Sequence, residues 1–257
     1  MSSPELERIN AFLSTFARRQ ARRTVDVPGG FAVFDDDFAL SYANNRLVVD
    51  GTLRTVAPGA LPALADEVLG GLPYRVVSVL DDEVARACAQ PLAGAGYSHS
   101  RYLVMLHTGP VPRAVRSARE VGLGELWEPV GRSWGRFLPD ADGELLRQLV
   151  ERRAARPRGA AVVRFLASLA DDGEVASWAD LYLDPAAGVA QVEDLVTAGA
   201  HLRRGHADAV LATALRMAAD AGCTTRFLTA DAQDWPRGWY GRRGFTPIGH
   251  HHAFQRT

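Results

Sequence analysis

The chain has 257 residues, of which 47% are hydrophobic and 23% are charged, with a formal net charge of −1. This composition is typical of a globular protein, and the length suits two domains better than one. Residues 1–112 contain 10 Arg against 12 acidic residues, and residues 113–257 contain 19 against 18. Neither half has the basic excess of a nucleic-acid-binding protein, so we expect no nucleic-acid partner.

Cysteine usage and hydropathy bear on the compartment. Cys88 and Cys223 lie far apart in the sequence, which argues against a disulfide framework or a zinc site. Charges at Glu5, Glu7 and Arg8 interrupt any apolar core of a signal peptide. No apolar run reaches the roughly 18 residues that cross a membrane. We expect a cytoplasmic protein with no membrane partner and no bound metal.

The first half of the chain predicts alternating helices and strands. Apolar residues at three- and four-residue spacing, from Leu6 to Phe16, favour a long N-terminal helix. The predicted elements are a helix over 4–23, strands over 31–34, 39–42 and 46–50, a helix over 61–69, a strand over 74–80, a helix over 83–92 and a strand over 101–107. Residues 109–112 resemble a linker.

The second half predicts two helices, a hairpin and a strand–helix–strand unit. Its elements are helices over 123–136 and 142–156, hairpin strands over 161–169 and 174–183, a strand over 189–197, a helix that Gly222 ends, a strand over 226–229, a short helix over 234–242 and a strand over 245–254. This order is typical of a mixed α/β layer fold.

One segment of the second half has the pattern of an anion-binding turn. The strand predicted at 189–197 leads into a turn over 203–207, and a helix begins directly after it. The first amide groups of a helix have no intrahelical acceptor and lie at the positive end of its dipole, so they attract phosphate. Gly205 permits a close backbone approach. The glycine patterns of P-loops and of Rossmann folds are both missing here.

This segment resembles the cofactor motif of the GNAT superfamily of N-acetyltransferases, Gln/Arg-x-x-Gly-x-Gly/Ala. Here Leu202-Arg203-Arg204-Gly205-His206-Ala207 occupies it, and Leu202 stands where Gln or Arg is usual. A second stretch, Trp239-Tyr240-Gly241-Arg242-Arg243-Gly244-Phe245, resembles the family's Leu/Trp-Tyr-x-x-x-Gly-Phe signature. The resemblance covers residues 113–257.

The resemblance implies a mixed, mostly antiparallel sheet flanked by helices, and acetyl-CoA as the cosubstrate without a metal. It places the pyrophosphate at the turn and the helix start, and the pantetheine arm along the end of the preceding strand. The implied cofactor-binding residues are Leu195, Val196, Thr197, Arg203, Arg204, Gly205, His206, Ala207 and Asp208.

The same resemblance implies an order of chemical steps. An amine loses a proton, attacks the thioester carbonyl and expels the CoA thiolate. Tyr240 matches the family's usual general acid. Glu193 and Asp194 are strand neighbours that point to opposite faces. Glu193 is the preferred base, while Asp194 and a water-mediated route stay open. A backbone N–H near 195–197 would stabilise the oxyanion.

Two further patterns suggest other chemistry and are interpreted differently. Residues 131–135 match GxSxG, but no buried strand precedes them, so a serine hydrolase elbow is not expected. His250, His251 and His252 form a tract without a third kind of ligand nearby in the sequence. We expect no metal site from this tract, and one of these histidines is a candidate for lining the acceptor pocket, which the final strand of this fold borders.

The two halves also resemble each other in the order of their elements. Gly96 and Tyr97 follow a helix as Gly244 and Phe245 do, and Leu92 falls at the position of Tyr240. Pro58 and Pro62 stand where the first half would need a phosphate cradle, and each Pro lacks an N–H. We therefore predict a degenerate GNAT-like domain over 1–112 and a catalytic one over 113–257, with an unrelated α/β domain as the alternative for the first.

The predicted activity is transfer of an acetyl or short acyl group from CoA to the amine of a small molecule or peptide. The acceptor cannot be derived from the sequence, because loops and hairpins set it. Two alternatives stay open: an acyl-CoA-binding sensor or assembly module without turnover, and an interaction protein whose first half recruits a partner. A homodimer is also left open.

Overall fold

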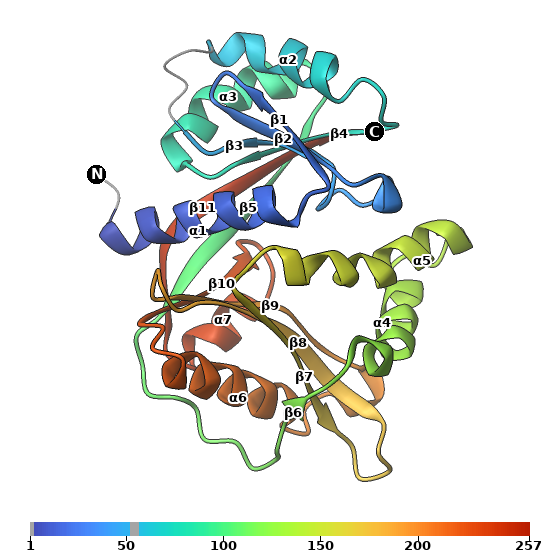
Figure 1. Ribbon diagram of the computed structural model, residues 1–257, viewed down its shortest axis with the longest axis vertical. Coiled ribbons are helices and arrows are strands. Elements are labelled where there is room, and N and C mark those ends of the chain that lie inside the picture. The colour runs from blue at the N-terminus through green and yellow to red at the C-terminus, as the bar shows by residue number, and fades with distance from the viewer. Residues whose placement is uncertain (1–2, 52–56) are drawn as a thin grey trace. The chain divides into compact units, whose positions relative to one another are not determined.

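The computed structural model describes residues 3–51 and 57–257, which form two compact units (Figure 1). The first unit comprises Met1–Met105, Thr229–Arg237 and Pro247–Thr257. The second comprises Leu106–Leu228 and Gly238–Thr246. The chain thus leaves the first unit and returns to it twice. The predicted division between residues 112 and 113 stays a prediction about ancestry.

The first unit contains a sheet and three helices. Its elements are α1 (Pro4–Gln20), β1 (Arg23–Val27), β2 (Gly30–Phe34), β3 (Arg46–Val49), α2 (Leu61–Val68), β4 (Arg75–Val79), α3 (Asp82–Gly94) and most of β5 (Ser98–His107) and β11 (Phe245–Arg256). The strand order is β1-β2-β3-β4-β11-β5. The pairs β1–β2 and β2–β3 are antiparallel, and β3–β4 is parallel across the α2 crossover.

The core of the first unit depends on residues from both ends of the chain. Leu47, Val77 and Leu92 are fully buried in one cluster, and Phe254 of β11 lies in the same cluster with 1% exposure. Residues His252–Arg256 pair antiparallel with Arg75–Val79 of β4. The last strand is therefore part of this core.

Two sequence expectations for the first unit are wrong. Residues 39–42 form turns instead of a strand, because the Asn45 side-chain amide donates to the carbonyls of Phe38 and Ser41 at 2.7 and 3.2 Å and holds the chain in a turn. The N-terminal helix ends at Gln20 rather than at residue 23. The strand β1, which follows it, was not predicted because four of its five residues are exposed and show no apolar alternation.

The second unit has a sheet with helices against it. Its elements are β6 (Arg119–Glu120), α4 (Leu123–Phe137), α5 (Gly143–Glu151), the 3₁₀ segment η4 (Arg152–Arg158), β7 (Val162–Leu169), β8 (Val175–Asp184), β9 (Val189–Thr197), η5 (Gly199–His201), α6 (His206–Asp220), the start of β10 (Thr225–Asp231) and the end of α7 (Pro236–Gly241). The strand order is β10-β9-β8-β7-β6.

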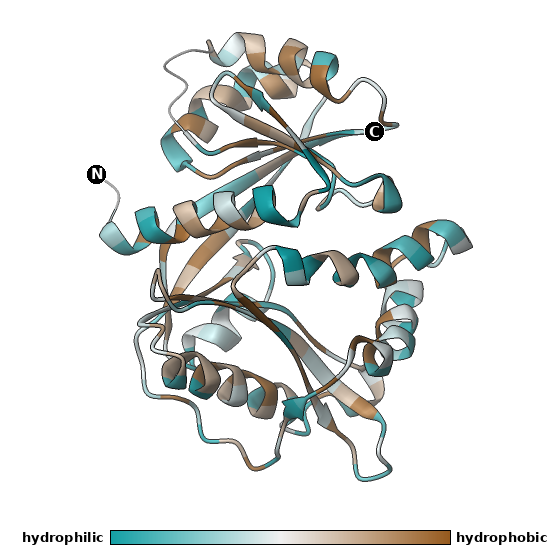
Figure 2. Ribbon diagram, viewed as in Figure 1, coloured by the Kyte–Doolittle hydropathy of each residue, from teal (hydrophilic) through white to brown (hydrophobic). Residues whose placement is uncertain are grey.

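The strand pairing of the second unit repeats that of the first. The pairs β7–β8 and β8–β9 are antiparallel, and β9–β10 is parallel across the α6 crossover. Figure 2 shows these strands mostly in brown, which agrees with the burial of Ala176–Leu183 in β8. The expected mixed α/β fold, a mostly antiparallel sheet with flanking helices, is confirmed.

The structure also places several other predicted elements. The helix expected over 142–156 ends at Glu151 and continues as the η4 segment. Ser133 of the GxSxG pattern lies inside α4, so no nucleophile elbow forms there. Among the described residues, no helix combines the length and the apolar character that a membrane span requires.

Candidate functional site

The predicted phosphate turn lies between β9 and α6 and leaves the helix start open. Gly205 is the N-cap residue of α6 at φ 83°, and Arg203 is also left-handed at φ 61°. Glycine has no side chain that could cap the helix, so the first turn of α6 has no side-chain cap at this residue. A Cβ on Gly205 would meet nothing within 4 Å. Glycine is therefore needed here for its backbone conformation and not for lack of space around a Cβ.

A buried histidine fixes the first turn of α6 to the sheet. The side chain of His206, the first residue of the helix, is buried, and its Nδ1 lies 2.9 Å from the hydroxyl of Ser168 on β7. That hydroxyl donates to the carbonyl of Ser117 at 2.8 Å, so it accepts from Nδ1–H of His206. Burial lowers the pKa of His206, and the nearby Arg116 lowers it further. His206 thus acts as a neutral anchor of the turn.

The turn presents two positive charges to solvent. Arg203 and Arg204 are exposed, as is Leu202 with 54% of its surface accessible. The carbonyl of Arg204 accepts a hydrogen bond from Arg116 Nε at 3.1 Å, and Arg116 also pairs with Asp171 at 2.9 Å. Arg116 thus holds the backbone of the turn at Arg204, and His206 holds it at the start of α6, while the side chains of Arg203 and Arg204 are exposed.

The end of β9 has an edge that β10 does not cover. The parallel register of the two strands comprises three pairs and ends at Gln191 and Phe227. The strand β9 continues to Thr197, where it pairs with Ser177 of β8 on its other side. Backbone groups of residues 195–197 therefore lie on a strand edge beyond the β9–β10 pairing. Such an edge can bind an extended amide-containing chain.

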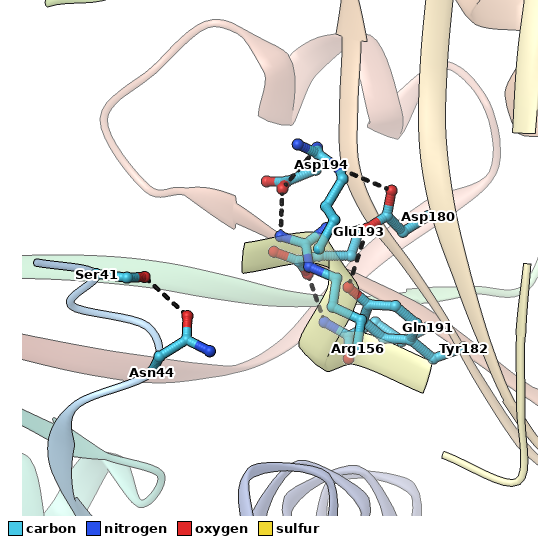
Figure 3. Close-up of polar contacts among 9 residues, drawn as sticks. Ser41, Asn44, Arg156, Asp180, Tyr182, Gln191, Glu193 and Asp194 are labelled. Atoms are coloured by element: carbon cyan, nitrogen blue, oxygen red, sulfur yellow. Dashed lines mark hydrogen bonds and ion pairs between the residues drawn. The ribbon is translucent and has the colours of Figure 1, made fainter. Parts of the chain in front are cut away.

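The two candidate bases lie at a β-bulge. Trp178 and Asp180 of β8 pair with Val196 and Glu193, so one β8 residue faces two residues of β9. Asp194 is one of these two and has φ 49°, in the left-handed region. The simple alternation of faces expected at this pair is interrupted there. Figure 3 shows Glu193 and Asp194 in one polar cluster.

The two carboxyl groups of this cluster differ in their charge. Gln191 Nε2 donates to Glu193 at 2.5 Å. Burial raises the pKa of Glu193 to about 7, and the negative charge of Asp194 contributes to that shift. Asp194 is partly buried, and Arg156 and Arg153 hold its pKa well below the usual range. Asp194 is thus a permanent anion, whereas Glu193 can exchange a proton near neutral pH.

Two buried arginines join β8, β9 and η4. Arg153 contacts Asp180 at 3.3 Å and Asp194 at 3.0 Å. Arg156 contacts the same two carboxylates, with 2.6 Å to Asp194 (Figure 3). The hydroxyl of Tyr182 donates to Asp180 at 3.3 Å. Asp180 is fully buried, and a buried carboxylate without a partner is costly, so this network holds the bulge that carries Glu193.

This network was not predicted from the sequence. Its arginines lie in the stretch Arg152-Arg153-Ala154-Ala155-Arg156, which a helical pattern assigns to an exposed helix end. The available signal was Asp180 in the middle of an otherwise apolar strand over 175–183. A charge in such a strand requires a buried partner of opposite sign.

Tyr240 lies in α7, and 9% of its surface is exposed. Its ring packs edge-on against Trp239 and Phe245 at centroid distances of 5.2 and 5.7 Å. Burial raises its pKa, and the charges of Glu193 and Asp194 raise it further. The phenol therefore stays protonated and can serve as a proton donor.

The histidine tract lies in β11, in the part of that strand that belongs to the first unit. His252 Nε2 is 2.9 Å from Asp82, its Nδ1 is 2.9 Å from His99, and His251 contacts Asn10 at 2.9 Å. In residues 3–51 and 57–257, no three His, Cys, Asp or Glu side chains are grouped to hold a metal. The tract therefore has hydrogen-bonding roles in that unit.

Comparison with known proteins identifies the domain that contains this site. The acetyltransferase (GNAT) family matches residues 127–245, the range that includes the turn, the bulge and Tyr240. Residues 127–245 form a GNAT acetyltransferase domain. The chain thus contains an acetyltransferase domain, and the cosubstrate of that family is acetyl-CoA.

Solved structures share the fold of this acetyltransferase over nearly the whole chain. A GCN5-related N-acetyltransferase from Kribbella flavida is 20% identical at a TM-score of 0.67, and the match covers 99% of this chain and 96% of that one. A conserved protein of unknown function from Staphylococcus epidermidis ATCC 12228 is 12% identical at 0.67, with 93% and 94% covered. A GCN5-related N-acetyltransferase from Sphaerobacter thermophilus is 16% identical at 0.58, with 88% and 76% covered. No curated protein matches the sequence significantly.

Proposed function

We propose that this acetyltransferase moves an acetyl or short acyl group from CoA to the amine of a small molecule or peptide. The open, glycine-capped start of α6 carries this proposal, because it offers amides and a positive dipole end to a pyrophosphate. The pyrophosphate would lie on the amides of residues 205–208, with charge from Arg203 and Arg204. The pantetheine arm would extend along Leu195, Val196 and Thr197, on the strand edge beyond the β9–β10 pairing.

The proposed reaction begins with proton removal from the acceptor ammonium by Glu193, whose pKa of about 7 suits a base near neutral pH. The amine nitrogen then attacks the thioester carbon, and a β9 edge N–H stabilises the oxyanion. The C–S bond breaks, and Tyr240 donates its proton to the departing thiolate. The attacking nitrogen loses its second proton to solvent, so the products are an amide and free CoA thiol. Glu193 releases its proton to solvent, and solvent returns one to Tyr240.

We also propose that residues 1–112 derive from a GNAT-like domain without a cofactor turn, and residues 113–257 from the catalytic one. The repeated pairing order supports this: two antiparallel pairs followed by a parallel pair across a helix, in β1–β4 and again in β7–β10. We further propose a cytoplasmic location, which suits the two free, buried cysteines Cys88 and Cys223.

Calorimetry with acetyl-CoA, followed by thiol release with a panel of amines, tests the proposal. We expect one CoA per chain and turnover with at least one class of amine. Binding without turnover across the panel would favour the sensor or assembly module instead. A wild-type chain that does not bind acetyl-CoA would overturn the assignment.

A further inference from the structure

An ion pair connects the two motifs of the site. Arg243, two residues before the end of the second motif, directs Nε to a carboxylate oxygen of Asp208. Asp208 is the third residue of α6, in its first turn. The side chains are only 18% and 28% exposed, so solvent screens this pair less than it would a pair on an open surface.

The same arginine also holds the segment that carries the acid. Its Nη1 donates to the carbonyl of Trp239 at 3.0 Å, and its guanidinium carbon lies 3.6 Å from the centroid of the Trp239 ring. Its backbone N–H donates to the carbonyl of Tyr240 at 2.9 Å. A planar guanidinium makes this combination of stacking and forked hydrogen bonds, and an ammonium cannot. One side chain therefore links the backbone next to Tyr240 with the first turn of α6.

The charge of Asp208 matters for an anionic ligand. A carboxylate in the first turn of a helix interacts favourably with the helix dipole. Its negative charge also offsets the positive potential that would otherwise attract a phosphate. The side chain of Asp208 pairs with Arg243, while its backbone N–H belongs to the predicted phosphate turn. With the pair intact, the helix start keeps its open amides and gains no net negative charge.

We propose that Arg243 is a positioning residue for acyl transfer, which rests on the proposed function above. The ion pair with Asp208 neutralises the carboxylate beside the phosphate turn. The hydrogen bond and ring contact with Trp239 fix the position of the neighbouring Tyr240 relative to a bound thioester. The first effect acts on CoA affinity and the second on turnover, so the two can be measured separately.

The test compares Arg243→Ala with the double variant Arg243→Ala/Asp208→Asn, by calorimetry with CoA and by kcat. The single variant leaves a bare carboxylate at the turn, so we expect Kd for CoA to rise ~3–5-fold. We expect kcat to fall ~10–100-fold, because misplacement of a reacting group by about 1 Å is worth that much. In the double variant Kd should return to within ~2-fold of wild type while kcat stays low.

Two further variants make the result interpretable. Arg243→Lys keeps the charge but not the stacking, so CoA affinity should hold and kcat should fall ~3–10-fold, even if the alanine variant does not fold. Arg242→Ala removes the neighbouring exposed charge and should change neither quantity.

An unchanged kcat in the alanine and lysine variants would overturn the proposal, as would a Kd that the second substitution does not restore. Failure of the proposed function itself gives different results. The wild-type chain would then not bind acetyl-CoA, or the Gly205→Asp variant would bind CoA as well as the wild type. Both results are obtained before Arg243 is altered.

Discussion

The crossover helices of the two units begin differently. Helix α6 follows β9, and its N-cap residue Gly205 has a left-handed backbone. Helix α2 comes between β3 and β4, the other parallel pair, and starts at Ala60. Pro58 precedes it and Pro62 lies in its first turn, and neither can donate an N–H. Residues 52–56 of that connection lie outside the described residues.

The turns that lead from α3 into β5 and from α7 into β11 share a backbone conformation but differ in one side chain. Gly96 and Gly244 have φ of 83° and 84°, and each is followed by a buried aromatic residue. The residue four positions before the glycine is Leu92 in the first unit and Tyr240 in the second. The comparison teaches that two turns can share a backbone conformation while only one of them carries a hydroxyl donor at the corresponding position.

The largest effect expected from this difference is on Tyr240. Tyr240→Phe removes the proton donor with little change of volume, so turnover should fall by ~10²–10⁴ while CoA binding changes less than ~2-fold. Tyr74→Phe is the matched control in the first unit, where the hydroxyl donates to the Ala39 carbonyl at 2.6 Å. Stopped-flow and steady-state thiol release measure both. Unchanged turnover in Tyr240→Phe, with chemistry limiting, would reduce Tyr240 to a packing residue.

The next effect concerns the two left-handed glycines. Gly205→Asp places a Cβ and a negative charge at the phosphate turn, and we expect CoA affinity to fall by ~10-fold or more. Gly96→Asp imposes a similar strain of ~1–2 kcal/mol at φ 83° in the first unit. It should lower Tm and leave CoA affinity unchanged. Equal losses of affinity in both variants would mean that the turn has no special role.

The pH profile sharpens the assignment of the base. Glu193 accepts a proton only when it is ionised, and its pKa is raised to about 7. The log of kcat/KM should therefore rise with pH up to about 7 and level off above it. Glu193→Gln should remove this limb and lower kcat/KM by ~10²-fold at pH 8. A limb that persists in the variant would favour Asp194 or a water-mediated route.

The smallest effect tests whether the first unit takes any part in chemistry. Asp81 caps α3 by accepting hydrogen bonds from the backbone of Glu83 and Val84, both at 2.9 Å. Asp81→Ala should cost ~0.5–2 kcal/mol of stability by loss of the cap. Denaturant unfolding measures that cost, and kcat at a temperature well below Tm should not change. A proportional fall in kcat would give the first unit more than a supporting role.

The spacing of apolar residues and the positions of Gly and Pro predicted most of the helices and strands correctly. The strand predicted at 189–197 matches β9, and the helix after Gly205 matches α6, because strand-to-glycine-to-helix signals are local. The predictions failed where side chains compete with the backbone, as Asn45 does beyond the turn at 39–42. They also failed at β1, whose exposed edge carries no periodic signal.

The residues of the candidate site also differ in whether a local sequence pattern identifies them. Gly205 and Tyr240 could be named from the sequence because they belong to short motifs. The partners of Asp180 could not, since Arg153 and Arg156 are 27 and 24 residues away along the chain. The bulge at Asp194 is likewise a property of pairing between two strands. Contacts of this kind depend on tertiary packing, which no local pattern encodes.

The participation of β11 in the first unit affects how the chain can be made. Phe254 belongs to the core that Leu47, Val77 and Leu92 begin near the other end of the sequence. A ribosome delivers those three residues early and Phe254 more than 150 positions after Leu92. Domains usually fold as units during synthesis, the N-terminal one first. Here the first unit must wait with an incomplete core until the second has been synthesised, so biosynthesis couples the two units even if catalysis uses only one.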